Sequence, residues 1–174
     1  IDMDTLMDNA ALIKSAGEQA GLELFFMTKQ IGRNPYVCRR LMELGYPGAV
    51  VVDYREAEVM MANGIPIAHA GHLVQIPNGA LTRLIEYGAR YITVYTLEKA
   101  AHINAICSRM GVVQDICLKV VDESDMVYEG QEGGWLLDGL EAALEQLSGY
   151  EHIRVAALTA FPCFLSSAQA GSVQ

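Results

Sequence analysis

Lys29 is the residue whose setting in the sequence best suits covalent chemistry. It ends the apolar run Leu24-Phe25-Phe26-Met27-Thr28 and precedes a glycine and the pair Asn34-Pro35. Such a run is typical of a buried strand, and a lysine at its end lies at the mouth of a core. A lysine held away from water loses its proton more easily and then attacks carbonyl carbons as a free amine. We therefore predict a catalytic role for Lys29, against the common alternative of a solvated lysine in a loop.

His69 and His72 form a His-x-x-His pair, which raises the question of a metal site. Residues three apart on a strand point to opposite faces, so the two rings meet only if the strand ends by about Ala70. No third ligand stands at a standard spacing, and we predict no metal site. Either histidine could line a pocket or handle a proton, and a buried, hydrogen-bonded histidine is an equal alternative.

The segment 130–134, Gly-Gln-Glu-Gly-Gly, is a further candidate binding loop. Adjacent glycines let the backbone approach a ligand closely. Gln131 is the candidate binding side chain in this loop. An ordinary long turn is the equally weighted alternative.

Helical patterns that end at glycine alternate with apolar runs along the chain. Glycine just past a helix supplies a left-handed cap that turns the chain back, and a strand follows. The glycines are Gly21, Gly45, Gly64, Gly88, Gly111 and Gly149, and the predicted strands are 24–29, 49–53, 65–70, 91–96, 116–121 and 153–158. Helix starts are predicted at the caps Asp4, Asn34 and Thr96. Helices between apolar strands indicate parallel strands joined by crossovers, which is an α/β fold.

A (β/α)8 TIM barrel fits this even repetition better than a doubly wound sheet, because the chain has neither a dinucleotide-binding nor a P-loop glycine motif. Such barrels need about 250 residues. We therefore expect residues 1–174 to be a partial barrel domain of six or so strand-helix units, without the closing strands. The carboxyl ends of barrel strands gather on one face and build the active site. This adds Tyr95, Thr159 and Phe161 to the candidate site residues.

Composition narrows the function classes. The chain has 174 residues, 52% of them hydrophobic, and a net charge of −9, which argues against nucleic acid and acidic membranes as partners. Its four cysteines form no C-x-x-C pair, which argues against a disulfide framework and a cysteine-based zinc site and favours a cytoplasmic location. No apolar run is long enough for a membrane span.

Several strings together resemble the N-terminal barrel of alanine racemase-like, fold type III pyridoxal-phosphate enzymes, and within them the YhfX-type branch. These strings are residues 1–6, 25–35, 118–120, 130–134 and 158–161, and the resemblance covers nearly the whole chain. It implies that Lys29 holds pyridoxal 5'-phosphate as a Schiff base and acts as a base in amino-acid racemisation or epimerisation. It also implies a cofactor pocket that includes Lys29, His69, His72, Tyr95, Gln131, Thr159 and Phe161. In alanine racemases the opposite base is a tyrosine of the partner subunit's C-terminal domain, so a homodimer is expected, and this chain holds no such domain.

Two departures from the family pattern bear on the substrate. Ala160 stands where alanine racemases have the histidine that stacks on the cofactor, and residues 125–129 lack the arginine of their Gly-Met-x-Arg motif. Alanine is therefore not the expected substrate. Aldol cleavage or decarboxylation on the same cofactor, a non-catalytic pyridoxal-phosphate carrier in vitamin homeostasis, and a sugar-phosphate or metal-dependent barrel centred on His69 and His72 are the alternatives.

Overall fold

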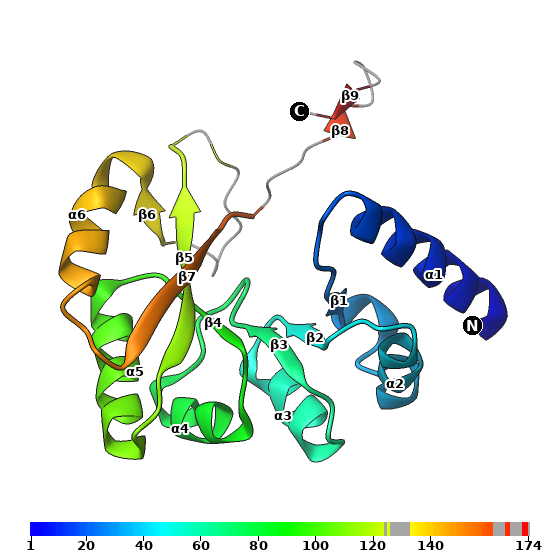
Figure 1. Ribbon diagram of the computed structural model, residues 1–174, viewed down its shortest axis with the longest axis horizontal. Helices are drawn as coiled ribbons and strands as arrows, with labels where there is room; N and C mark the ends of the chain where they lie inside the picture. The colour runs from blue at the N-terminus through cyan, green and yellow to red at the C-terminus, as the bar shows by residue number, and fades with distance from the viewer. Residues whose placement is uncertain (124, 126–132, 162–165, 168–171, 174) are drawn as a thin grey trace.

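The structure, a computed structural model, describes residues 1–123, 125, 133–161, 166–167 and 172–173, the last four by their backbone alone (Figure 1). Among these residues the main sheet has seven strands, all parallel to their neighbours, in the order β1-β2-β3-β4-β5 with both β6 and β7 paired to β5. The strands are β1 Phe26–Met27, β2 Ala49–Val51, β3 Ile67–Ala70, β4 Tyr91–Val94, β5 Gln114–Val121, β6 Trp135–Leu136 and β7 Ile153–Thr159. The predicted α/β fold with parallel strands is confirmed.

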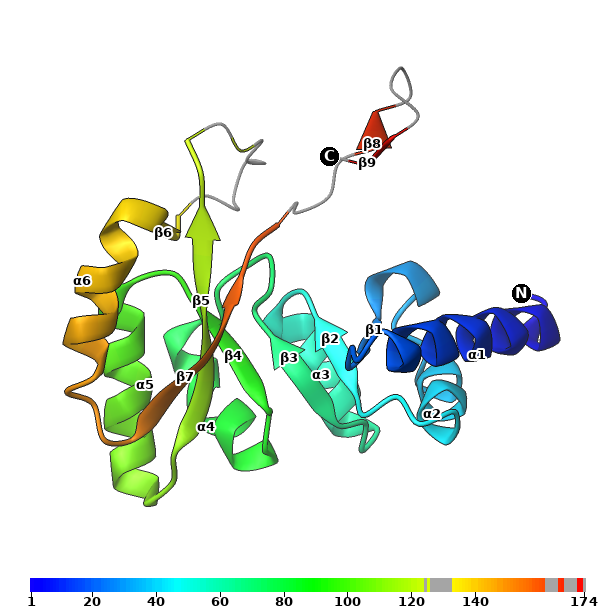
Figure 2. The same ribbon diagram turned by 45° about the horizontal axis from the view of Figure 1, so that its top comes forward.

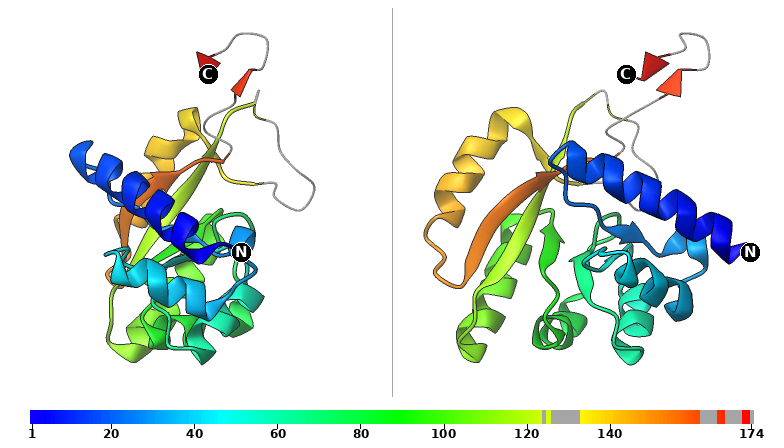
Figure 3. Two further views of the ribbon diagram at one scale, coloured as in Figure 1. Left: turned by 90° about the vertical axis from the view of Figure 1, so that its right-hand side faces the viewer. Right: turned by 45° about the vertical axis from the view of Figure 1, so that its right-hand side comes forward.

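Helices alternate with most of the strands. The helices are α1 Met3–Gln19, α2 Pro35–Glu43, α3 Tyr54–Ala62, α4 Asn78–Tyr87, α5 Leu97–Met110 and α6 Leu137–Leu147. Helix α1 precedes β1, a helix follows each of β1 to β4, and α6 lies between β6 and β7. Helices α3, α4, α5 and α6 follow one another around the outside of the curved sheet (Figure 3). This is the arrangement of an open arc of a TIM barrel. Within the described part of the chain, every helix is too short or too polar to cross a membrane.

The core lies between this arc of strands and its helices. Its strand residues include Val51, Ile67, Ile92, Val94, Ile116 and Leu118, each no more than 2% exposed. Both faces of a parallel sheet are covered, so its strands bury consecutive apolar residues rather than alternate ones. This is why unbroken apolar runs located β2, β3, β4 and β5, whereas the two-residue strand β6 carried no such run and was not predicted.

The helix caps agree with the sequence in two of three cases. Asn34 accepts a hydrogen bond from the Tyr36 backbone N–H at 2.9 Å, and Thr96 accepts one from the Lys99 N–H at 3.2 Å. The cap predicted at Asp4 was wrong. Helix α1 starts at Met3 because Asp2 accepts from the Thr5 N–H at 3.1 Å, and Asp4 lies within the first turn. An acidic residue there is still favoured by the helix dipole.

Five of the six punctuating glycines take the left-handed conformation predicted for them. Their φ angles lie between 67° and 91°, at Gly21, Gly45, Gly64, Gly88 and Gly111. Gly149 is the exception, since α6 ends with Ser148 in the right-handed region and Gly149 donates to the Gln146 carbonyl at 3.4 Å. Helix α6 therefore ends in a tighter right-handed turn instead of a left-handed glycine cap.

The first strand is shorter than its apolar run suggested. β1 spans two residues and pairs, among the described residues, with β2 alone, and a 3-10 helix η1 Lys29–Ile31 follows it. At the far end of the chain, β8 Ser166–Ser167 and β9 Ser172–Val173 pair antiparallel with each other and not with the main sheet (Figures 1 and 2).

Close approach of β2 and β3 requires glycine at position 48. A Cβ on Gly48 would lie 2.7 Å from the Pro66 carbonyl oxygen, the atom that accepts the Ala49 N–H in the sheet. We therefore expect Gly48→Ala to lower the free energy of unfolding by about 1–3 kcal/mol, because backbone must shift to relieve the contact. Urea unfolding of the variant against the parent protein measures this.

The matched control is Gly79→Ala, in the first turn of α4, where a Cβ meets nothing within 4 Å. It should leave the stability unchanged or raise it by up to about 1 kcal/mol. Equal effects of the two substitutions would contradict the close-approach explanation.

Candidate functional site

The candidate residues collect where the strands end. Lys29 lies two residues beyond β1, His72 two beyond β3, Tyr95 one beyond β4 and Phe161 two beyond β7. Because the strands are parallel, these ends share one edge of the sheet (Figure 2). These four candidate residues therefore lie at one edge of the sheet, as expected for the ends of parallel strands.

Lys29 and Phe161 come from opposite ends of the strand order and still meet. The Lys29 Nζ atom lies 5.9 Å from the centroid of the Phe161 ring, within the range of a cation–π contact. Lys29 is half-buried at the start of η1. The curvature of the sheet therefore brings the segments that follow β1 and β7 close to each other.

His72 lies in the middle of this group. Its ring centroid is 5.5 Å from that of Phe161 and 5.5 Å from that of His69. Burial, and then the positive charges of Lys29 and Lys119, lower the pKa of His72 below the ordinary histidine value. Its Nδ1 atom is buried and has no hydrogen-bond partner among the described residues. A neutral imidazole with one unsatisfied nitrogen thus faces the site, and such an atom calls for a ligand or water.

His69 is held more firmly than His72. Its Nε2 atom is 2.5 Å from Oγ1 of the buried Thr93, and burial, followed by the nearby His72, lowers its pKa to about 4. Strand β3 ends at Ala70, which is the condition for the two histidines to lie together. In the part of the chain that the structure describes, no three His, Cys, Asp or Glu side chains gather as metal ligands would.

Lys119 is a further side chain at this edge, which sequence reasoning did not single out as functional. It lies in β5 with 4% exposure, and its Nζ atom is 4.7 Å from the Tyr95 ring centroid. The sequence did contain a feature that could have identified it, a lysine inside the apolar run 116–121. Lysine is almost never fully buried without a partner, so its presence in a buried strand is unusual. Thr93, the partner of His69, carried no comparable signal, because threonine is common in strands.

Tyr95 and Thr159 support the edge of the site. The Tyr95 hydroxyl is 3.3 Å from the His72 carbonyl oxygen, to which it donates, and burial raises its pKa to about 12. Thr159, the last residue of β7, is in register with Lys119. Tyr95 therefore holds the segment after β3 by a hydrogen bond. Because its hydroxyl stays protonated at neutral pH, it is a poor base.

The glycine loop is described in part. A Cβ on Gly134 would lie 2.8 Å from the Lys119 carbonyl oxygen, so the close approach that the glycines permit is made to β5 of the chain itself. Gln131 lies outside the described residues, and its binding role stays a prediction.

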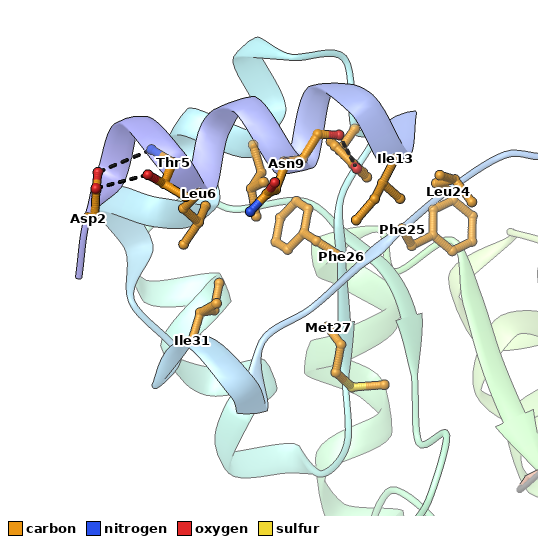
Figure 4. A pocket seen from close by; sticks show the side chains of 13 residues that line it. Asp2, Thr5, Leu6, Asn9, Ile13, Leu24, Phe25, Phe26, Met27 and Ile31 are labelled. Carbon is orange, nitrogen blue, oxygen red and sulfur yellow. Dashed lines mark hydrogen bonds between the residues drawn. The ribbon is translucent and has the colours of Figure 1, made fainter. Parts of the chain in front are cut away.

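An apolar cavity of about 560 Å³ lies away from this site, between α1 and the segment that runs from β1 to α2 (Figure 4). Its lining includes Leu6, Ile13, Phe26 and Ile31. Three polar residues of the lining already have partners: Asp2 caps α1, Thr5 donates its hydroxyl to Asp2 at 2.9 Å, and the Tyr46 hydroxyl donates to the Ala10 carbonyl at 2.9 Å. We therefore assign the chemistry to the Lys29 edge.

Buried His69 makes the stability of the fold depend on pH. Its pKa is about 4 when folded, against 6.5 ordinarily, so the unfolded chain binds the proton first as the pH falls. The free energy of unfolding therefore keeps its full value above pH 6.5. Between pH 6.5 and about 4 it falls by up to about 3 kcal/mol, because the unfolded chain gains a proton that folded His69 does not take up. We expect His69→Gln to flatten this part of the stability-pH curve, measured by urea unfolding at several pH values. An unchanged slope would contradict the assignment.

The sequence matches the family described as "Alanine racemase, N-terminal domain" over residues 1–172. It is 41% identical over 173 residues to the uncharacterized protein YhfX of Escherichia coli (strain K12), an alignment that covers 99% of this chain and 45% of the relative. The chain therefore spans less than half the length of this curated relative.

Solved structures show the same fold. D-threonine aldolase from Filomicrobium marinum superposes with a TM-score of 0.71 at 20% identity, over 91% of this chain and 42% of that one. Alanine racemase from Clostridium difficile 630, in complex with cycloserine, gives a TM-score of 0.60 at 20% identity, over 77% and 35%. At such identities the likeness concerns the fold. By its sequence match, and with a fold that agrees, this chain belongs to the alanine racemase N-terminal domain family.

Proposed function

We propose that this chain is the cofactor-binding part of a pyridoxal-phosphate enzyme that racemises or epimerises an amino acid, with Lys29 as the lysine that binds the cofactor. The observation that carries the proposal is the position of the Lys29 amine, at the carboxyl end of β1 and against Phe161 and the His72 group. The family and the racemase relative support the same reading.

The residues at this edge fit such a cofactor, which is a planar ring with an aldehyde and negatively charged groups. Lys29 offers an amine, and the unsatisfied Nδ1 of His72 offers a hydrogen bond. Phe161 offers an apolar surface, and Lys119 offers positive charge. His69, Tyr95 and Thr159 complete the proposed lining, to which the resemblance adds Gln131.

The chemistry divides between the cofactor and Lys29. When bound, the cofactor supplies an electron sink that makes the α-proton of an attached amino acid easier to remove. Lys29 would hold the cofactor through its Nζ amine, and the same nitrogen, once free, would take up or return the α-proton of the bound amino acid. His72, kept neutral by burial and by two lysines, adds a polar contact without adding charge.

Racemisation also needs a base on the opposite face of the substrate. Tyr95 is not suited to that role, because its hydroxyl is buried, engaged and difficult to deprotonate. We assign the second base to a region outside this chain, in a homodimer that completes each site. Lyase chemistry is the alternative, and the fold shared with a D-threonine aldolase is compatible with it.

The test adds pyridoxal phosphate to the protein at its natural full length, reduces with borohydride and maps the modified peptide by mass spectrometry. We expect a visible absorbance band and a single reduced adduct on Lys29, both lost in Lys29→Ala because the nucleophilic amine is gone. Lys14→Ala, which removes a lysine paired with Glu18 on α1, is the control and should keep both. The absence of a band, or adducts spread over many lysines, would overturn the proposal.

The reaction type is tested separately, by incubating the loaded protein with amino acids in deuterated water. Exchange of the α-proton with loss of optical activity indicates a racemase or epimerase. Release of an aldehyde or of carbon dioxide would instead assign the protein to lyase or decarboxylase chemistry.

A further inference from the structure

The turn that carries Lys29 has an unfavourable backbone conformation. Thr28 starts it, η1 covers Lys29 to Ile31, and both Gly32 and Arg33 then take left-handed φ angles, 65° and 56°. The Arg33 N–H closes the turn on the Thr28 carbonyl at 3.0 Å. Arginine seldom adopts this conformation, so other contacts must hold it there.

One buried carboxylate supplies those contacts. The Glu56 side chain, on α3, is 3% exposed. Its Oε1 atom accepts from Arg33 Nε at 2.7 Å and lies 2.6 Å from Arg33 Nη2, while its Oε2 atom accepts from the Thr28 hydroxyl at 3.1 Å. Glu56 thus ties together the residue just before Lys29 and the residue at the end of the turn.

Glu56 is not needed to cap its own helix. Asp53 already caps α3 by accepting the Glu56 backbone N–H at 2.9 Å. In an ordinary capping box a glutamate at this position would turn back to the Asp53 backbone N–H. Here it accepts instead from the N–H of Val52, at 2.8 Å, while also reaching the Lys29 turn.

We propose that Glu56 is a positioning residue, which fixes the turn of residues 28–33 so that the Lys29 amine faces the His72 and Phe161 group. This inference rests on the proposed role of Lys29 and deepens it. The carboxylate suits the task because it is held at both oxygens. Two nitrogens of the Arg33 guanidinium converge on Oε1, while Oε2 accepts from the Thr28 hydroxyl and the Val52 N–H. Without Glu56 the turn would sample conformations in which Lys29 points elsewhere.

The test is Glu56→Gln in the full-length protein, which keeps the size of the side chain but weakens its pairing with Arg33. We expect the borohydride-trapped pyridoxal-phosphate adduct to form on Lys29 about tenfold more slowly, or slower still. Small misplacements of a reacting group have effects of that size. The share of adduct on other lysines should rise. A purely structural role would not change this selectivity in a protein shown by circular dichroism to be folded.

Glu58→Gln is the matched control, on the same helix, in an exposed ion pair with Arg83 at 3.5 Å. It should leave both rate and selectivity unchanged. Arg33→Gln combined with Glu56→Gln should lose little more than Glu56→Gln alone, because that variant has already weakened the contact between the two side chains. A second measurement needs no cofactor. The backbone amide of Arg33 should exchange its hydrogen with solvent faster in Glu56→Gln than in the parent protein.

The outcomes separate the two proposals. If the parent protein forms no Lys29 adduct, the proposed function fails and this inference fails with it. If the parent forms the adduct and Glu56→Gln forms it at the same rate and selectivity, only the positioning role is overturned. Unchanged amide exchange at Arg33 would overturn it as well.

Discussion

The common direction of the strands is the constraint on which the rest of this structure depends. Each crossover helix returns the chain to the starting edge, so strands β1 to β5 and β7 all end on the same side. Both faces of such a sheet must be covered, and its interior excludes polar groups that lack partners. Polar side chains are therefore concentrated at the shared carboxyl edge, as Lys29, His72 and Tyr95 are here.

Burial at that edge sets the charge state of the site. Removing imidazoles from water favours their neutral form, and the neighbouring lysines favour it further at His72. The site therefore combines cationic side chains with neutral histidines rather than a cluster of like charges. Such a combination suits a ligand that is both anionic and able to share hydrogen bonds.

The contact between Glu56 and Arg33 illustrates how stability and function can compete. Moving a carboxylate out of water is costly, and a buried ion pair often stabilises a fold no better than apolar residues of the same size. The left-handed Arg33 adds a further cost. Both features lie beside Lys29 and fix the geometry of its turn, which is where functional strain is usually found. Fold similarity to an aldolase and to a racemase does not distinguish their reactions, so the chemistry has to be read from such local features.

The sequence by itself determined the alternation of strands and helices, most helix ends, and the place of Lys29 after the first strand, because these depend on local periodicity and on capping residues. It predicted too long a first strand and a left-handed cap at Gly149, and both were wrong, since strand pairing and the final turn decide them. Only the tertiary structure brought Lys29 against Phe161, turned Lys119 towards Tyr95 and placed Glu56 beneath the Lys29 turn. These contacts join residues far apart in the chain, and they depend on the curvature and register of the sheet, which no local pattern encodes.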